Sequence, residues 1–253
     1  MPACAELRRP RRQGGTVGQM GELLNRLTGA LSVRDREEPL SGRLCDSYRE
    51  LAGADGAAIT VHYETANRVT LCTTNQVAHR LEDLQDVLGE GPGHTASASG
   101  QIESCVVPAP ASPRWPIFVD AAQDVVDSAQ ILAVPMHPDR HAFGVITLYQ
   151  SPRTDHPLAL ERKELQFLAN VVGAALITDT DASDEVTSGP WASRAQIHQA
   201  TGMVVAQLHI SPEDALALLR AHAYGQQTTL SNVATAVVGR RIKFPSTDWW
   251  YSS

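Results

Sequence analysis

The stretch that decides how the C-terminal part folds is Arg194–Lys243, which reads RAQIHQATGMVVAQLHISPEDALALLRAHAYGQQTTLSNVATAVVGRRIK. Its apolar residues recur every three or four positions in three successive runs, the spacing that places side chains on one face of a helix. The pattern predicts three short helices around one small core, with Gly202 allowing two of them to approach closely. The predicted core residues are Ile197, Ala200, Val204, Ala215, Leu218, Leu219, Val233, Ala234 and Val237.

The ends of the second helix are marked most clearly. Ser211 is a good N-cap residue, and Pro212 fits the first helical position, where a backbone donor would have no partner. Glu213 and Asp214 follow at the positive end of the helix dipole, and Gly225 provides a stop. These signals predict a helix from about 212 to 225.

Four groups of residues in this stretch carry a family resemblance: IHQATGMV (197–204), SPEDAL (211–216), LLRAHA (218–223) and LSNVA (230–234). In order, spacing and helix ends they resemble the ANTAR family, whose members bind RNA and act as transcription antiterminators in bacterial signalling. The resemblance implies that residues 191–244 form an RNA-binding module. Thr201 stands where many members carry Lys.

The polar residues that remain outside the predicted core are the candidates for RNA contact. An arginine offers a two-pronged donor to phosphate or guanine, and a tyrosine ring can stack on an unpaired base. The start of the third helix attracts phosphate through its free N–H groups, and basic residues follow its far end. The candidates are Arg220, Tyr224, Gln227, Thr228, Ser231, Asn232, Thr235, Arg240, Arg241 and Lys243.

The charge of the chain is unevenly distributed. The whole chain has a net charge of −7, whereas the stretch 194–243 holds five basic and two acidic residues, a local charge of +3. A mildly basic module on an acidic protein favours selective over indiscriminate RNA contact.

The region before this module alternates between helix and strand patterns. Helices are predicted at about 17–33, 38–51, 76–88 and 160–177, and strands at 57–63, 68–74, 104–107, 131–136 and 143–149. This order predicts an α+β fold with an antiparallel sheet flanked by helices. Gly89–Gly93 is predicted to be a tight turn that ends a helix, and the stripe Leu165, Leu168, Val172 and Ala175 to be a dimerisation surface.

Three segments of this region resemble the GAF family: LGEGP (88–92), RWPIF (114–118), and VPM (134–136) with FGVITLY (143–149). The resemblance implies a GAF fold over residues 17–178 and a small molecule held between the sheet and the loops that cover it. Its identity, like that of any cofactor, stays unknown. The implied lining residues are Tyr63, Cys72, His94, Trp115 and Tyr149.

The chain is thus predicted to hold two domains and three connecting or terminal segments. These are a disordered basic arm (1–16), the GAF domain (17–178), a linker (179–190), the three-helix ANTAR domain (191–244) and an aromatic tail (245–253).

Several functional classes are disfavoured. The four cysteines form no CxxC pair, which predicts reduced thiols in the cytoplasm. No apolar run approaches the roughly 20 residues that span a bilayer, so no membrane association is predicted. The nine histidines show no metal spacing, and no nucleophile–base arrangement is legible, so neither a metal site nor an enzyme is predicted.

The resemblances together predict a signal-responsive, homodimeric antiterminator that binds hairpin-loop RNA in leader transcripts. Three alternatives stay open. Three short helices also resemble helix-turn-helix modules of DNA-binding transcription factors. A GAF-fold thiol redox enzyme would use Cys72 and Cys105, and a degenerate module would serve as a protein–protein adaptor.

Overall fold

The computed structural model describes residues 15–63, 67–109, 114–137, 143–152, 158–179 and 190–244. The basic arm up to residue 14, almost all of the predicted linker, and the aromatic tail lie outside these ranges. None of the helices in the described ranges is long and apolar enough to cross a membrane.

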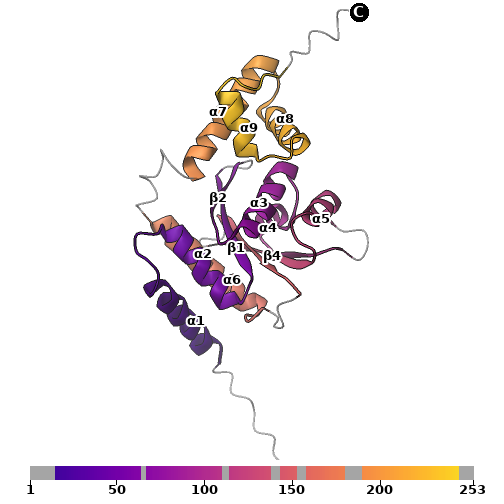
Figure 1. Cartoon of the computed structure of the whole chain (residues 1–253). Helices are drawn as coiled ribbons and strands as arrows, with labels where there is room; N and C mark the ends of the chain where they lie inside the picture. Colours follow the sequence, from indigo (N-terminus) through magenta and orange to yellow (C-terminus); the bar gives the residue numbers. More distant parts are fainter. Residues whose placement is uncertain are drawn as a thin grey trace, which may run out of the picture.

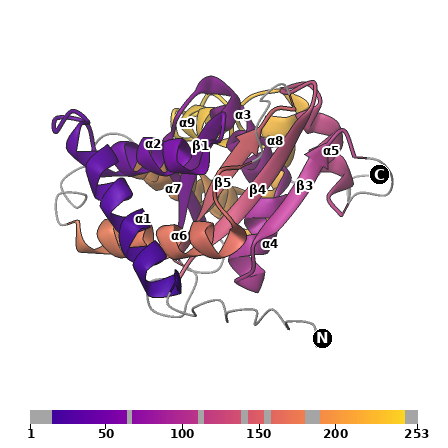
Figure 2. The ribbon, with the colours of Figure 1, turned by 90° about the horizontal axis from the view of Figure 1, so that it is seen from below.

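A five-stranded antiparallel sheet forms the centre of the N-terminal part, which confirms the predicted α+β class. The strands lie in the order β2-β1-β5-β4-β3, and Figure 2 shows β5, β4 and β3 side by side. Each predicted strand is present within two residues of its expected ends. The strands are β1 (Gly56–Tyr63), β2 (Asn67–Thr73), β3 (Glu103–Val107), β4 (Ala129–Met136) and β5 (Gly144–Gln150).

One face of the sheet packs against α2 (Leu40–Ala52) and α6 (Arg162–Thr178), and α1 (Gly15–Ser32) packs against these two helices; the three lie together in Figure 1. Ile59 and Val61 point from β1 into this main core. The predicted dimerisation stripe on α6 is wrong, because Leu165, Leu168 and Val172 are at most 1% exposed in the same core. This stripe holds the helix to its own sheet.

The other face of the sheet packs against α3 (Gln76–Leu88), α4 (Pro92–Ser99) and α5 (Pro116–Ala122). The Asn75 side chain accepts from Ala78 N at 2.9 Å and so caps α3, and Gly89 ends the helix in the left-handed conformation, φ +65°. The predicted helix is therefore confirmed. The predicted turn over Gly89–Gly93 is confirmed only as far as Gly91, because Pro92 and Gly93 already belong to α4. The helices α4 and α5 were not predicted. The sequence of α4, PGHTASAS, has no apolar stripe to announce a helix.

The C-terminal part consists of α7 (Pro190–Leu208), α8 (Pro212–Gly225) and α9 (Leu230–Val238) around a core of their own, as predicted. Ser211 caps α8 by accepting from Asp214 N at 3.1 Å. Two expectations about this core are wrong. Leu218, a predicted core residue, is 37% exposed, and Leu216 is buried in its place. A Cβ added to Gly202 would meet nothing within 4 Å, so this glycine does not serve close helix packing.

The two parts are in contact. The helix α3 packs against α8 and α9, and α7 packs against β2. Val87 of α3 is 7% exposed and belongs to the same apolar cluster as the core of the C-terminal helices. Figure 1 shows the three C-terminal helices above α3 and β2.

Candidate nucleic-acid interface

The loop between α8 and α9 and the first turns of α9 bring six predicted RNA contacts together. Tyr224, at the end of α8, is 53% exposed, and Gln227 and Asn232 are also exposed. Thr228, Ser231 and Thr235 lie beside them, each half-buried. All six lie in or next to the segment that leads into α9.

Hydrogen bonds hold this loop in a defined conformation. Thr229 caps α9 by accepting from Asn232 N at 3.1 Å, and Asn232 Nδ2 donates to Thr228 Oγ1 at 3.1 Å. Thr235 Oγ1 donates to Gln196 Oε1 of α7 at 2.7 Å. Gln227 has a φ of +51°, so the backbone turns sharply before α9. The exposed groups are thus presented by a backbone with little freedom.

The basic residues lie at the other end of α9. Arg240, Arg241 and Lys243 are all exposed, and Arg240 has a φ of +55° where the chain leaves the helix. With nine residues in α9, the two ends are about 13 Å apart at a rise of 1.5 Å per residue. The structure therefore separates the predicted contacts into a polar loop and a basic end.

Arg220 belongs to neither group. It is half-buried where α8 meets α3, and its Nη1 would lie 3.4 Å from a Cβ added to Gly89. Burial lowers the pKa of Arg220, opposed by the nearby charge of Asp86. Its Nε atom is buried without a hydrogen-bond partner among the described residues. In this arrangement Arg220 faces the N-terminal part of the chain.

A buried polar network lies beneath this contact, between α3 and the sheet. Arg68 of β2 donates to Glu82 and to Asp86, each at 2.9 Å. Glu82, 1% exposed, also accepts from Thr60 Oγ1 at 3.0 Å and from Gln85 Nε2 at 2.7 Å. This network was not predicted from the sequence, although Glu82 and Asp86 are one helical turn apart on α3, with Gln85 beside them.

The network extends to two neutral histidines. His94 Nε2 bonds to the carbonyl of Gln85 at 3.0 Å, and a 3.1 Å hydrogen bond joins His62 Nδ1 to Ser97. Burial, and next the charge of Arg68, lower the pKa of His94 to about 3 and that of His62 to about 4. Both rings are therefore uncharged at neutral pH.

Asp86 connects the network to the C-terminal part. Burial raises its pKa to about 6, against the opposing charges of Arg68 and Arg220. Since Arg68 belongs to β2 and Arg220 to α8, one carboxylate lies between a buried arginine of the sheet and an arginine of the C-terminal helices.

The predicted ligand-lining residues do not converge on one cavity. His94, Trp115 and Tyr149 are on the α3–α5 side of the sheet, where Trp115 Nε1 donates to Thr95 Oγ1 at 2.9 Å. Cys72 is on the opposite side, where its thiol donates to the carbonyl of Ser41 at 3.1 Å. The side chain of Tyr63 lies outside the described residues.

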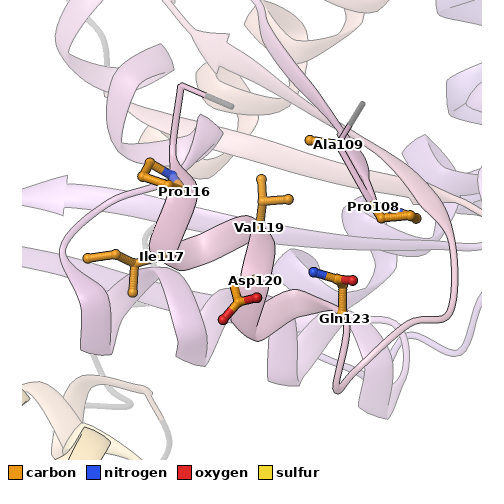
Figure 3. Close-up of a pocket in the computed structure, with 7 residues that line it drawn as sticks. All are labelled: Pro108, Ala109, Pro116, Ile117, Val119, Asp120 and Gln123. Atoms are coloured by element: carbon orange, nitrogen blue, oxygen red, sulfur yellow. The ribbon is translucent and has the colours of Figure 1, made fainter. Parts of the chain in front are cut away.

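Two open hollows lie on the α5 side of the molecule. One, of about 510 Å³, is formed by residues after β3 and in α5, which Figure 3 shows. The other, of about 330 Å³, includes Tyr149, whose hydroxyl accepts from Asn75 Nδ2 at 3.0 Å. Of the predicted lining residues, only Tyr149 lines one of these two hollows.

The described residues give little support to a metal site or to a thiol redox enzyme that uses Cys72 and Cys105. No three His, Cys, Asp or Glu side chains there cluster as a metal site. Cys72 and Cys105 lie on β2 and β3, the opposite edges of the sheet. Four strand spacings of about 4.8 Å put these edges about 19 Å apart, too far for the two thiols to act on one substrate.

A family model supports the C-terminal assignment. Residues 191–238 match the ANTAR domain, as their sequence motifs predicted, and the match covers less than half of the chain. None of the curated proteins compared with the chain matches it.

Solved structures resemble the chain at low identity. The GAF domain of A. aeolicus nlh2 in an inactive state is 14% identical, with 63% of this chain and 94% of that chain covered and a TM-score of 0.38. GAF3 from a Synechocystis protein, in its photoproduct state, is 15% identical, with 62% and 98% covered and a TM-score of 0.36. The chromophore-binding domain of a Stigmatella aurantiaca bacteriophytochrome is 14% identical, with 67% and 63% covered and a TM-score of 0.36. The chain has the predicted two-part architecture, an antiparallel sheet flanked by helices, followed by helices that match the ANTAR domain over residues 191–238.

Proposed function

We propose that this protein is a cytoplasmic transcription antiterminator whose C-terminal helices bind hairpin-loop RNA in leader transcripts in response to a signal. The ANTAR match over residues 191–238 is the observation that carries this proposal. The N-terminal part is the sensor of a small ligand or of a partner, as its sequence resemblance to GAF domains implies.

The polar loop is suited to unpaired bases. The exposed ring of Tyr224 offers a stacking face, and the amides of Gln227 and Asn232 offer donors and acceptors for base edges. Ser231 and the start of α9 supply N–H groups for a phosphate, with Thr228 and Thr235 at the side. Because hydrogen bonds already order this loop, little entropy is lost when RNA binds.

The basic end extends the surface along α9. Arg240, Arg241 and Lys243 would contact phosphates about 13 Å from the loop, given the rise per residue of a helix. Arg220 becomes available to RNA only if α8 separates from α3, since its guanidinium faces Asp86 and Gly89 in the present arrangement. A two-hairpin target would suit a homodimer, whose contact surface is not the buried α6 stripe.

Within the N-terminal part, the α3–α5 side of the sheet is the better candidate for sensing. It holds His94, Trp115 and Tyr149 together with the buried network of Arg68 and Glu82. A ligand at the hollow beside Tyr149 would touch the hydroxyl that bonds to Asn75, the N-cap of α3. A signal there would reach α3 directly.

The test is RNA binding by the full chain. Filter binding to hairpin RNAs with randomised loops, in competition with duplex DNA, should select a set of hairpins. Tyr224→Ala should weaken binding of the selected hairpins about fivefold or more, since base stacking on an aromatic ring contributes about 1–3 kcal/mol. Leu218→Ala removes another exposed apolar side chain of α8 and should leave the affinity unchanged. Sequence-specific duplex binding without RNA binding would instead identify a DNA-binding transcription factor.

A further inference from the structure

We infer that Cys45 and Cys72 form an oxidisable thiol pair, which a hydroperoxide converts into a disulfide between α2 and β2. This modification site is independent of RNA binding, and the predicted enzyme alternative used a different pair. Cys72 lies on β2 and Cys45 on α2, which packs against that strand. Both side chains belong to the main core cluster of the N-terminal part.

A hydrogen bond holds Cys72 against the turn of α2 that carries Cys45. The Cys72 thiol donates to the carbonyl of Ser41 at 3.1 Å. In a regular helix the same carbonyl is the partner of the N–H of Cys45, four residues later. The Cys72 side chain is also the largest influence on the Cys45 thiol, whose pKa it raises. A disulfide would therefore join two elements that already pack against each other.

Their surroundings give the two thiols different roles. Cys45 is 1% exposed, whereas Cys72 is half-buried at an edge strand and more accessible to an oxidant. The Cys72 side chain, and next burial, raise the pKa of Cys45 well above its ordinary value. Cys45 thus stays a thiol, and Cys72 is the sulfur that reacts first.

The chemistry balances with one hydroperoxide. The Cys72 thiolate attacks the distal peroxide oxygen, an S–O bond forms, the O–O bond breaks, and the alcohol leaves with the thiol proton. The Cys45 sulfur then attacks the Cys72 sulfenic acid, an S–S bond forms, and the hydroxyl group leaves as water with the Cys45 proton. Two thiols lose two electrons in total, and the peroxide gains them.

The disulfide would join two elements that lead to the C-terminal helices. The helix α2 packs against α6, the last helix before residues 180–189, and β2 packs against α7. A bond between α2 and β2 would therefore restrain the two elements that contact α6 and α7. Any effect on RNA binding rests on the function proposed above, but formation of the bond does not.

The test is peroxide titration of the full chain in a Cys4→Ser background, which leaves three thiols. After reduction and removal of the reductant, stoichiometric hydrogen peroxide should remove two thiols and two hydrogen atoms in mass. Peptide mapping should link 45 to 72, and dithiothreitol should restore both thiols. Cys105→Ser, at the far edge of the sheet, should form the same bond.

Cys45→Ser and Cys72→Ser should form no bond within the chain, and Cys45→Ser should accumulate a sulfenic acid at Cys72 that dimedone traps. A circular dichroism spectrum matching the parent shows that each variant is folded. The inference would be overturned if the folded parent formed no bond between Cys45 and Cys72 in excess peroxide. Disulfides that include Cys105 would also overturn it. Loss of RNA binding alone would bear only on the proposed function.

Discussion

Arg220 of α8 lies against Gly89 at the end of α3, with 3.4 Å between its Nη1 and the position of a Cβ on that glycine. The arginine carries charge into a contact whose other members include the buried Val87. Residues of the C-terminal helices thus cover the end of α3.

The first prediction concerns this contact. Arg220→Ala should weaken the docking of α8 on α3 by about 1 kcal/mol, because Asp86 keeps its bond to Arg68 and only one charged partner is lost. Hydrogen exchange should accelerate about fivefold in the last turn of α3. Arg240→Ala, an exposed arginine after α9, should change exchange there little. If Arg220→Ala leaves α3 unchanged but weakens RNA binding as Tyr224→Ala does, Arg220 contacts RNA and not α3.

The second prediction concerns the buried ion pair of Arg68 and Glu82, which are 6% and 1% exposed. Arg68→Ala leaves a buried carboxylate without its partner and should cost about 3–5 kcal/mol in the free energy of unfolding, measured by urea denaturation. Arg34→Ala breaks a surface pair with Glu50, 61% exposed, and should cost about 0–1 kcal/mol. Replacing both buried partners, as Arg68→Met with Glu82→Leu, should recover part of the loss. Equal losses for Arg68→Ala and Arg34→Ala would show that the network is hydrated.

The third prediction is a pH dependence from His94. Burial lowers its pKa in the folded state to about 3, below the ordinary 6.5. As the pH falls below 6.5, the unfolded chain therefore gains a proton that the folded chain refuses, and stability is lost progressively down to about pH 3. Between pH 7 and pH 5 the loss should be about 2 kcal/mol.

His94→Gln isolates this contribution, because the variant keeps a donor for the Gln85 carbonyl but does not titrate. The difference between wild type and variant also removes the opposite trend of Asp86, whose raised pKa of about 6 makes stability fall as the pH rises from about 4 to 6. Unfolding curves at pH 7 and pH 5 provide the measurement. Identical pH dependence in both proteins would mean that folding does not lower the pKa of His94.

The fourth prediction concerns the basic end of α9. Removing two phosphate contacts with Arg240→Ala and Arg241→Ala should reduce the slope of log K against log salt by about 1.4, at about 0.7 per contact for single strands. The control pair Arg26→Ala with Arg36→Ala removes the same charge from exposed positions in and just after α1. If the control pair changes the slope by the same amount, the salt dependence comes from the net charge of the protein and not from phosphate contacts at Arg240 and Arg241.

The elements with strong local signals were predictable from the sequence. The bounds of α3 match because Asn75 caps its start and Gly89 ends it, and the start of α8 follows from Ser211 and Pro212. Both signals depend only on neighbours in the sequence, so tertiary structure did not change them.

What could not be predicted depends on contacts between distant segments. Leu216 is buried in place of Leu218 because α8 packs against α3 as well as against α7 and α9, which moves its apolar face. The charges of Arg68, Glu82 and Asp86 have the pattern of solvated residues, and only the approach of α3 to the sheet buries them. Of the candidate RNA contacts, the grouping around Asn232 follows from local sequence, whereas the docking of Arg220 does not.

The packing of α3 on both sides has a mechanical consequence. One side of this helix bonds through Glu82 and Gln85 to the sheet and to α4, and Val87 on its other side completes the core of the last three helices. Because α3 moves as a rigid body, a small shift of the helix toward the sheet would open an equal gap between α3 and α8. Separating the two parts, by expressing each on its own, would leave Val87 exposed to water on one fragment and an incomplete core on the other.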